Sequence, residues 1–293
     1  MLNLNFNVFV LIIPCILDSA MSPDGRNFIR SAKSGSDWTE NELLAYNIKV
    51  SRQESQQFFG RELGSIDHLD PNLLSTVKPS IATHLAKETY RFLTYLDLAS
   101  HANVGQESAT DDFGKNLLEI MGYDEPGTIV RSRYHIPLTI SGETKAAKAD
   151  VCLVHTHSMV LLIIQEDKTN TSLQSPEAQV IAEAIGAFQY NNRIRCDHHL
   201  IPLEAMSIPC ITMVGTRPCF YKVPVTQELS SAVISAQYPE QPTIVTCCAL
   251  AAGQSRAWKC QIIVGLPYGN TTLFANWHRF CGSNLLLDSK ERS

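Results

Sequence analysis

Three charged side chains stand where they could bind a divalent cation and promote attack on a phosphate. Asp150 opens one apolar run of strand length, and Glu166 and Lys168 close the next one. The short polar link 156–158 between the runs predicts a β-hairpin. With a three-residue loop centred on Ser158, Asp150 would lie directly across from Glu166, with Cβ atoms roughly 4.5–5.5 Å apart. Two carboxylates at that separation can share one Mg²⁺ ion.

This register is the simplest of three. A loop one residue shorter or longer would move Asp150 across from Gln165 or Asp167, and a one-residue slip transfers a side chain to the other face of the sheet. In the simplest register, the cation would polarise a phosphoryl oxygen and lower the pKa of a bound water. Lys168 would orient that water and offset the developing negative charge. The pattern therefore predicts metal-dependent phosphodiester hydrolysis.

An acid, a gap of about fifteen residues and then Glu-x-Lys at the end of a buried strand resembles the PD-(D/E)XK nuclease superfamily. Here Asp150 is preceded by Ala149, where the superfamily usually has Pro. Helices expected at 111–123 and 176–192 flank the strands, as in the αβββαβ core of that superfamily. The resemblance covers about residues 105–250.

The resemblance implies a nuclease that uses Mg²⁺ or Mn²⁺ and hydrolyses nucleic acid, with DNA favoured over RNA. It makes Asp150 and Glu166 metal ligands, and Lys168 the residue that positions the attacking water. The segments 164–168 and 176–193 are also similar to a family of uncharacterised fungal proteins. That second similarity supports the fold and supplies no function.

Other polar residues on the two expected helices are candidates for the same site. Acids at the start of the first helix, Glu107 above all, could add a metal ligand, although acids there also stabilise the helix dipole. Gln179 or Gln189 on the second helix would match the glutamine that positions the site in RecB-like nucleases. The Tyr expected four residues later is absent in both cases. Gln179 and Glu183 lie one turn apart, beside the apolar stripe, where a polar side chain is usually solvated.

Composition indicates a globular protein of 293 residues, with 44% hydrophobic and 18% charged residues. The net charge of −5 counts against a nonspecific nucleic-acid binder, which is usually basic. Six cations around the expected site could still form a basic rim, or could be scattered surface charge: Arg131, Arg133, Lys145, Lys148, Arg193 and Arg195. The nine cysteines have irregular spacing and no paired zinc motif, which fits a reduced, intracellular protein.

The first twenty residues contain the most apolar window, 8–17, which has Pro14 within it. The window is too short to cross a bilayer, so no membrane association is expected. It resembles the apolar part of a signal peptide, but no Lys or Arg precedes it and Met21 follows at once. Intracellular localisation, in cytoplasm or nucleus, is therefore expected, with secretion as the alternative.

The expected architecture is α/β: a restriction-endonuclease-like αβββαβ core with a central mixed sheet flanked by helices, and an α-rich N-terminal extension. Residues 1–35 form a flexible or signal-like lead-in, 36–104 a helical cap and 105–293 the nuclease-like domain. Further strands are expected at 128–140, 207–215, 217–225 and 243–248, and helices at 226–234 and 272–280. The strand 217–225 is expected toward the sheet edge because of its prolines.

A second function fits the same residues. Strand ends often carry charge because they emerge into solvent, so the motif would also survive in a catalytically inactive relative. Such a protein would keep the nuclease fold and act as a binding or interaction module, and the acidic net charge favours it. The metal-dependent nuclease is the function expected first.

Overall fold

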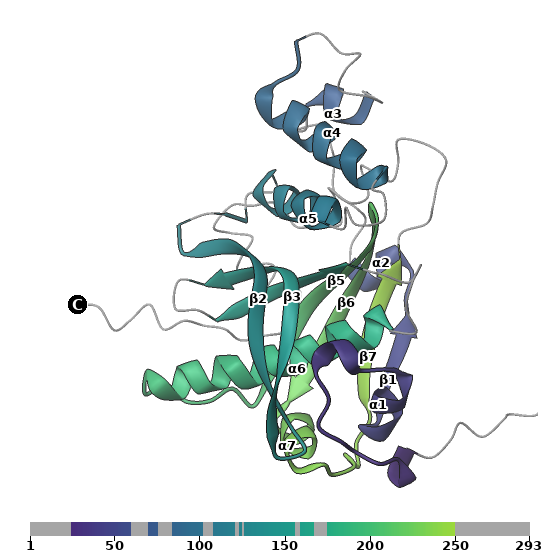
Figure 1. Ribbon diagram of the computed structural model, residues 1–293, viewed down its shortest axis with the longest axis vertical. Helices are drawn as coiled ribbons and strands as arrows, with labels where there is room; N and C mark the ends of the chain where they lie inside the picture. The colour runs from purple at the N-terminus through teal and green to yellow at the C-terminus, as the bar shows by residue number, and fades with distance from the viewer. Residues whose placement is uncertain are drawn as a thin grey trace, which may run out of the picture.

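A mixed sheet forms the centre of the computed structural model, with strand order β1-β7-β6-β5-β4-β3-β2, and helices cover both of its faces (Figure 1). The structure describes residues 25–59, 70–75, 84–101, 108–120, 123–124, 126–155, 159–166 and 175–249. The strands are β1 (Ile48–Arg52), β2 (Thr128–Ile140), β3 (Glu143–His155), β4 (Val160–Glu166), β5 (Ala205–Val214), β6 (Arg217–Thr226) and β7 (Thr243–Ala249).

Half of the sheet is built from consecutive elements. Helix α5 (Ser108–Ile120) is followed by β2, β3 and β4, which pair antiparallel with one another. Helix α6 (Pro176–Asp197) then crosses to β5, which runs parallel to β4. A parallel pair needs such a crossover because its strands enter the sheet from the same end. The predicted α/β class and central mixed sheet are thus confirmed.

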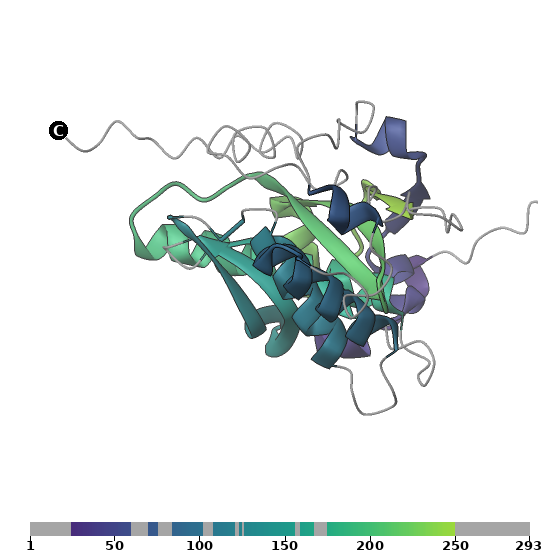
Figure 2. The ribbon, with the colours of Figure 1, turned by 90° about the horizontal axis from the view of Figure 1, so that it is seen from above.

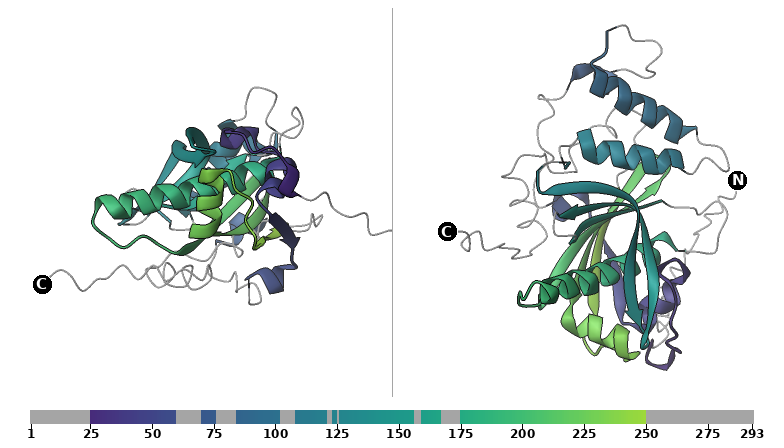
Figure 3. Two further views of the ribbon diagram at one scale, coloured as in Figure 1. Left: turned by 90° about the horizontal axis from the view of Figure 1, so that it is seen from below. Right: turned by 60° about the vertical axis from the view of Figure 1, so that its left-hand side comes forward.

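The two faces of the sheet carry separate hydrophobic clusters. On one face pack α2 (Ser55–Phe59), α3 (Pro71–Ser75), α4 (Lys87–Ser100) and α5, and Figure 2 looks down on α4 and α5 over the strands. On the other face lie α1 (Glu40–Ala45), α6 and α7 (Gln227–Ser235), as Figure 3 shows. Alternation along β3 puts Val151 in the first cluster and Cys152 in the second.

Helix α6 is buried on more than its sheet-facing side. Every residue from Val180 to Phe188 is buried, whereas an amphipathic helix would bury only one stripe. The cause is an N-terminal segment around the short helix η2 (Gly35–Asp37), which contacts both β3 and α6. A Cβ added at Gly35 would lie 3.1 Å from that of Ala147 and 3.8 Å from that of Ala182. A polar side chain in this part of α6 is therefore enclosed.

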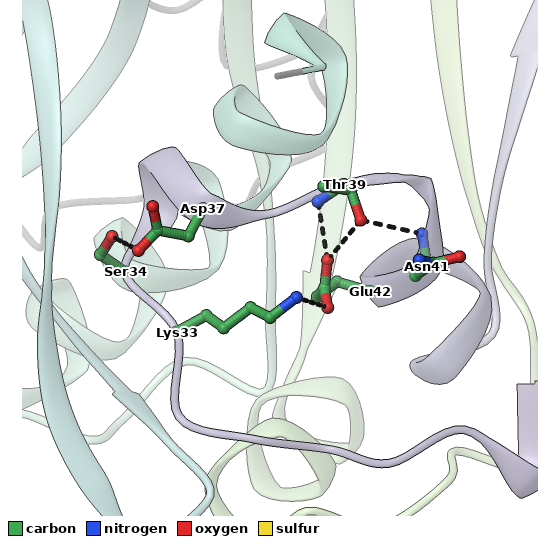
Figure 4. Close-up of polar contacts among 6 residues, drawn as sticks. All are labelled: Lys33, Ser34, Asp37, Thr39, Asn41 and Glu42. Carbon is green, nitrogen blue, oxygen red and sulfur yellow. Dashed lines mark hydrogen bonds and ion pairs between the residues drawn. The ribbon is translucent and has the colours of Figure 1, made fainter. Parts of the chain in front are cut away.

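The same N-terminal segment, which includes η1 (Gly25–Asn27), continues into α1. Helix α1 begins after Thr39. There the Thr39 and Glu42 side chains form a reciprocal capping box (Figure 4). Beside it, the buried Trp38 ring stacks on another aromatic of the same cluster. This segment is therefore part of the main core.

Strand β1 comes from the region predicted as a helical cap and pairs in parallel with β7 at one edge of the sheet. As a result β6 is an interior strand, so its predicted place toward the edge is wrong. Its prolines are tolerated because the β6–β7 ladder covers only Cys219 to Lys222. Pro218 and Pro224 lie outside that ladder, where no backbone donor is needed.

Three further predictions concern α7, membrane spanning and the two ends of the chain. Thr226 caps α7, accepting a hydrogen bond from the backbone N–H of Leu229 at 3.1 Å, as expected. No helix in the described ranges is long and apolar enough to cross a bilayer. The predicted lead-in up to residue 24 and the predicted helix 272–280 lie outside the described residues.

Candidate functional site

Asp150 does not pair with Glu166. The β3–β4 ladder aligns Val151 with Ile164, so the next position sets Asp150 across from Gln165. The two side chains meet there, with Gln165 Nε2 donating to Asp150 Oδ2 at 2.6 Å. The predicted register is therefore wrong by one residue.

The one-residue difference between the predicted and observed registers arises near the β3–β4 hairpin. His155 N donates to Met159 O at 2.8 Å, so the pairing is centred on residue 157 rather than on Ser158. A β-bulge then interrupts the ladder between Leu153 and Val154 and leaves Leu161 as an extra residue on β4. A bulge of this kind shifts the register without any strong sequence signal.

Asp150 also sits at a twist in the β2–β3 ribbon. The ladder is regular at Ser132–Val151 and at Tyr134–Ala149, but it skips the position between them, which holds Arg133 and Asp150. There Arg133 has a φ of 51°, a left-handed conformation that is uncommon for a residue with a side chain. Local strain of this kind is often found near functional sites.

A small group of polar side chains is enclosed between this part of the sheet and α6. Glu183 on α6 is completely buried, and its Oε1 accepts a hydrogen bond from Gln179 Nε2 at 3.0 Å. Its second oxygen, Oε2, has no hydrogen-bond partner in the part of the chain that the structure describes. Gln165, only 3% exposed, likewise leaves its Oε1 without a partner. Two buried acceptors are thus unsatisfied within one polar group, whereas buried polar atoms are nearly always bonded.

The electrostatics link these residues across the helix–sheet interface. Burial raises the pKa of Glu183 well above its usual range; the Gln179 hydrogen bond opposes this rise and the charge of Asp150 adds to it. Burial likewise raises the pKa of the Cys152 thiol to about 12, with Arg131 opposing and Glu183 adding to the rise. Glu183 therefore lies close enough to β3 to act on both Asp150 and Cys152.

The donor set suits a hard divalent cation. Asp150 and Glu183 supply carboxylate oxygens, and Gln165 supplies an amide oxygen, which are the ligand types that Mg²⁺ and Mn²⁺ prefer. Within the described ranges, no group of three or more His, Cys, Asp and Glu side chains could hold a metal. A site built here would therefore combine two carboxylates with an amide.

The other predicted residues fall in different places. The backbone of Glu166 ends β4, in register with Met213 of β5, and its side chain lies outside the described part, as do Lys168 and Glu107. Gln179 lies beside the polar group. Gln189, about 15 Å further along the helix, bonds the backbone of Thr139 through both ends of its amide, at 2.8 and 3.1 Å.

Glu183 is the residue whose importance the sequence understates. Its spacing from Gln179 suggests a solvated face, yet the structure buries it completely. One signal is present in the chain: the charge stands alone in the otherwise apolar run Val180–Gly186. A lone acid within such a run must be either paired or functional, since an isolated buried charge is costly.

Part of the expected basic rim exists as an aromatic and cationic cluster. Arg131 lies over the Tyr134 ring at 5.4 Å, and Arg193 lies over the Tyr190 ring at 5.1 Å. The two hydroxyls are 3.1 Å apart, which joins β2 to α6. Both arginines are exposed or partly exposed beside the twist at Asp150.

Two other members of the expected rim have local partners. Lys145 pairs with Glu143 at 2.7 Å, and Arg195 Nε donates to the Ile201 carbonyl at 2.8 Å. The described cationic surface is therefore strongest around Arg131 and Arg193, where aromatic rings accompany the charge.

Neither a scan of the chain against protein-family models nor a search of curated proteins gives a match. An α/β fold with a mixed sheet between helices supports many unrelated functions. Function is therefore inferred from the particular order of the elements together with the polar side chains that they place around Asp150.

Proposed function

We propose that this protein is a Mg²⁺- or Mn²⁺-dependent nuclease with a PD-(D/E)XK-like core, hydrolysing phosphodiester bonds in nucleic acid, with DNA favoured over RNA. The observation that carries the proposal is the element order α5-β2-β3-β4-α6-β5, with α5 and α6 on opposite faces and only the last strand pair parallel. This matches the αβββαβ arrangement implied by the motif, and Asp150 lies on the second strand of that series.

The proposed roles follow the chemistry of each side chain. Asp150 would hold the metal, with Glu166 as the second ligand that the motif implies, although the register places Gln165 and not Glu166 across from Asp150. Gln165 fixes the orientation of the Asp150 carboxylate through its 2.6 Å hydrogen bond. A bound divalent cation supplies a Lewis acid for the phosphoryl oxygen and lowers the pKa of its water. Lys168 would orient the attacking water and offset the charge that develops in the transition state.

Nucleic acid as the partner is supported by the cluster of Arg131, Tyr134, Tyr190 and Arg193. Cationic side chains bind backbone phosphates, and aromatic side chains stack on unpaired bases. The cluster is close to the polar group because Arg131 pairs across from Cys152. We place the protein inside the cell, in cytoplasm or nucleus, with secretion as the alternative if residues 1–20 act as a signal.

One observation favours a second candidate, a catalytically inactive relative that serves as a binding or interaction module. The register pairs Asp150 with Gln165 and not with Glu166, so the two carboxylates do not face each other as the motif chemistry expects. A nuclease fold that had lost its metal would retain the strands and the surface cluster.

A cleavage assay separates these functions. Labelled single- and double-stranded DNA and RNA are incubated with the full chain in Mg²⁺, Mn²⁺ or EDTA. We expect metal-dependent cleavage by the wild type and a loss of about 10²–10³-fold in Lys168→Ala and Asp150→Asn, because each removes a charge that acts on the transition state.

The matched control is Lys145→Ala, which removes a lysine that pairs with Glu143 near the β2–β3 turn. It should cleave at the wild-type rate. Absence of metal-dependent cleavage on every substrate would establish the inactive alternative, and full activity in Lys168→Ala would exclude the proposed mechanism.

A further inference from the structure

The polar group beneath α6 suggests a metal ligand that the motif does not contain. We infer that Glu183 is a carboxylate ligand of a divalent-cation site whose other protein ligands include Asp150 and the Gln165 amide oxygen. The inference rests on the proposed function for its biological purpose, but it concerns cation binding and can be tested without cleavage.

The first support is the arrangement of the donors. Gln165 is held in place because its Nε2 donates to Asp150 at 2.6 Å, which leaves its Oε1 as an acceptor in the same enclosed space. Glu183 is fixed from the helix side by Gln179 at 3.0 Å, which leaves its Oε2 as a second acceptor. Asp150 and Gln165 thus meet on the sheet, and Glu183 faces them from α6 closely enough for the charge of Asp150 to act on it.

The second support is that the Glu183 carboxylate has no cationic partner among the residues that the structure describes. Among the described residues, no Lys, Arg or His forms an ion pair with Glu183, although its side chain is fully buried. Leaving a buried acceptor unbonded costs free energy, and a carboxylate costs more than an amide. Folding alone would be better served by Leu or Gln at this position. A divalent cation would satisfy the orphaned oxygens of Gln165 and Glu183 and compensate the charge of the Glu183 carboxylate.

The observed β3–β4 register explains why a helix residue, Glu183, would supply the second carboxylate of the site. Because β4 presents Gln165, rather than Glu166, across from Asp150, the second carboxylate near Asp150 comes from the helix. The charge of Asp150 acts on Glu183, which is expected for two carboxylates near a common ion. The site is thereby assembled from strand and helix together, instead of from adjacent strands alone.

The test measures Mn²⁺ binding to the full chain by calorimetry and by the loss of the electron paramagnetic resonance signal of free Mn²⁺. Wild type should bind Mn²⁺, and Glu183→Gln should weaken binding by at least about tenfold, since it replaces a charged ligand. Gln165→Leu, which removes the neutral amide oxygen together with the Nε2 donor to Asp150, should weaken binding by a smaller factor. Circular dichroism of each variant establishes that it is folded.

Glu177→Gln is the matched control, because Glu177 is a partly buried acid on the same helix and its pKa is likewise raised chiefly by burial. It should bind Mn²⁺ as the wild type does. Equal Mn²⁺ affinity in wild type, Glu183→Gln and Gln165→Leu would overturn the inference while leaving an Asp150–Glu166 nuclease intact. No Mn²⁺ binding by wild type would also overturn it. Binding that depends on Glu183 in a protein that cleaves no nucleic acid would support the inference and refute the proposed nuclease.

Discussion

Two buried carboxylates on the same side of the sheet have opposite surroundings. Glu42 on α1 is 8% exposed, and Glu183 on α6 is 0% exposed. Glu42 accepts from Lys33 Nζ at 2.5 Å and from the backbone N–H and hydroxyl of Thr39 at 2.7 Å each (Figure 4). Glu183 accepts one hydrogen bond, from the neutral amide of Gln179, and has one oxygen without a partner.

The pKa values of the two groups differ accordingly. Burial raises the pKa of Glu42, but the hydrogen bonds and charge of Lys33 and the bonds from Thr39 outweigh it, so the net shift is downward. Burial raises the pKa of Glu183 well above its usual range, and a single neutral hydrogen bond is too weak to reverse this. Burial alone therefore does not decide the state of a carboxylate; its partners do.

The contrast distinguishes a structural acid from a functional candidate. Glu42 completes a helix cap and an ion pair, so its role is explained by folding. Glu183 destabilises the fold as it stands, and residues of that kind are commonly retained where a ligand completes their coordination. The predictions below test whether this difference is real.

The largest change in stability is expected when Glu42, the fully hydrogen-bonded carboxylate, is replaced. Glu42→Ala removes the capping-box partner and the Lys33 ion pair together, so we expect a loss of about 2–3 kcal/mol in the free energy of unfolding. Urea denaturation followed by circular dichroism measures it. A loss below about 0.5 kcal/mol would mean that the hydrogen bonds around Glu42 do not hold α1 in place.

Replacing Glu183, which has an unbonded carboxylate oxygen, should stabilise the protein instead of destabilising it. In EDTA at about pH 8, Glu183→Gln should raise the free energy of unfolding by about 1–2 kcal/mol, because it removes an uncompensated buried charge. A raised folded-state pKa means that the folded protein binds the proton more tightly, so stability is greatest below the unfolded pKa and is lost as pH rises through the folded one. The gain in Glu183→Gln should therefore shrink toward pH 5. A variant that is less stable than wild type at every pH would make Glu183 a structural residue like Glu42.

The smallest change in stability is expected for Gln189, a hydrogen-bonded polar residue on the same helix as Glu183. Gln189→Ala removes two hydrogen bonds that fasten α6 to the Thr139 backbone in edge strand β2. We expect a cost of about 1 kcal/mol in stability, with Mn²⁺ affinity unchanged. Thermal unfolding and calorimetry measure the two quantities. Unchanged stability together with lost Mn²⁺ binding would place Gln189, rather than the Gln165–Glu183 group, at the metal site.

Local patterns predicted the elements well. The strand at 128–140 has the predicted bounds, and α6 begins at Pro176 after a Ser175 cap, as the N-cap and proline signals indicate. These features depend on residues within a few positions of one another. The β3–β4 hairpin was predicted for the same reason, since its two apolar runs and polar link are contiguous.

Relations between distant segments were predicted less well. Strand β6 is interior because β7 and β1 pair outside it, and β1 comes from a segment about 200 residues away within the region predicted as a helical cap. The partner of Asp150 depends on one bulged residue, Leu161, whose type is equally at home in a regular strand. A single-residue slip is invisible in an apolar run, because every alternative register buries similar side chains.

The amino-acid sequence by itself determined the α/β order, the bounds of the strand 128–140 and the start of α6 at Pro176, while the helix expected at 111–123 lies at Ser108–Ile120. Only the tertiary structure decided which polar side chains meet around Asp150. It paired Asp150 with Gln165 and enclosed Glu183, because the bulge sets the strand register and the N-terminal segment packs against α6. The register depends on one bulged residue within the hairpin, which has no strong sequence signal. The burial of Glu183 depends on an N-terminal segment that is far from α6 in the chain.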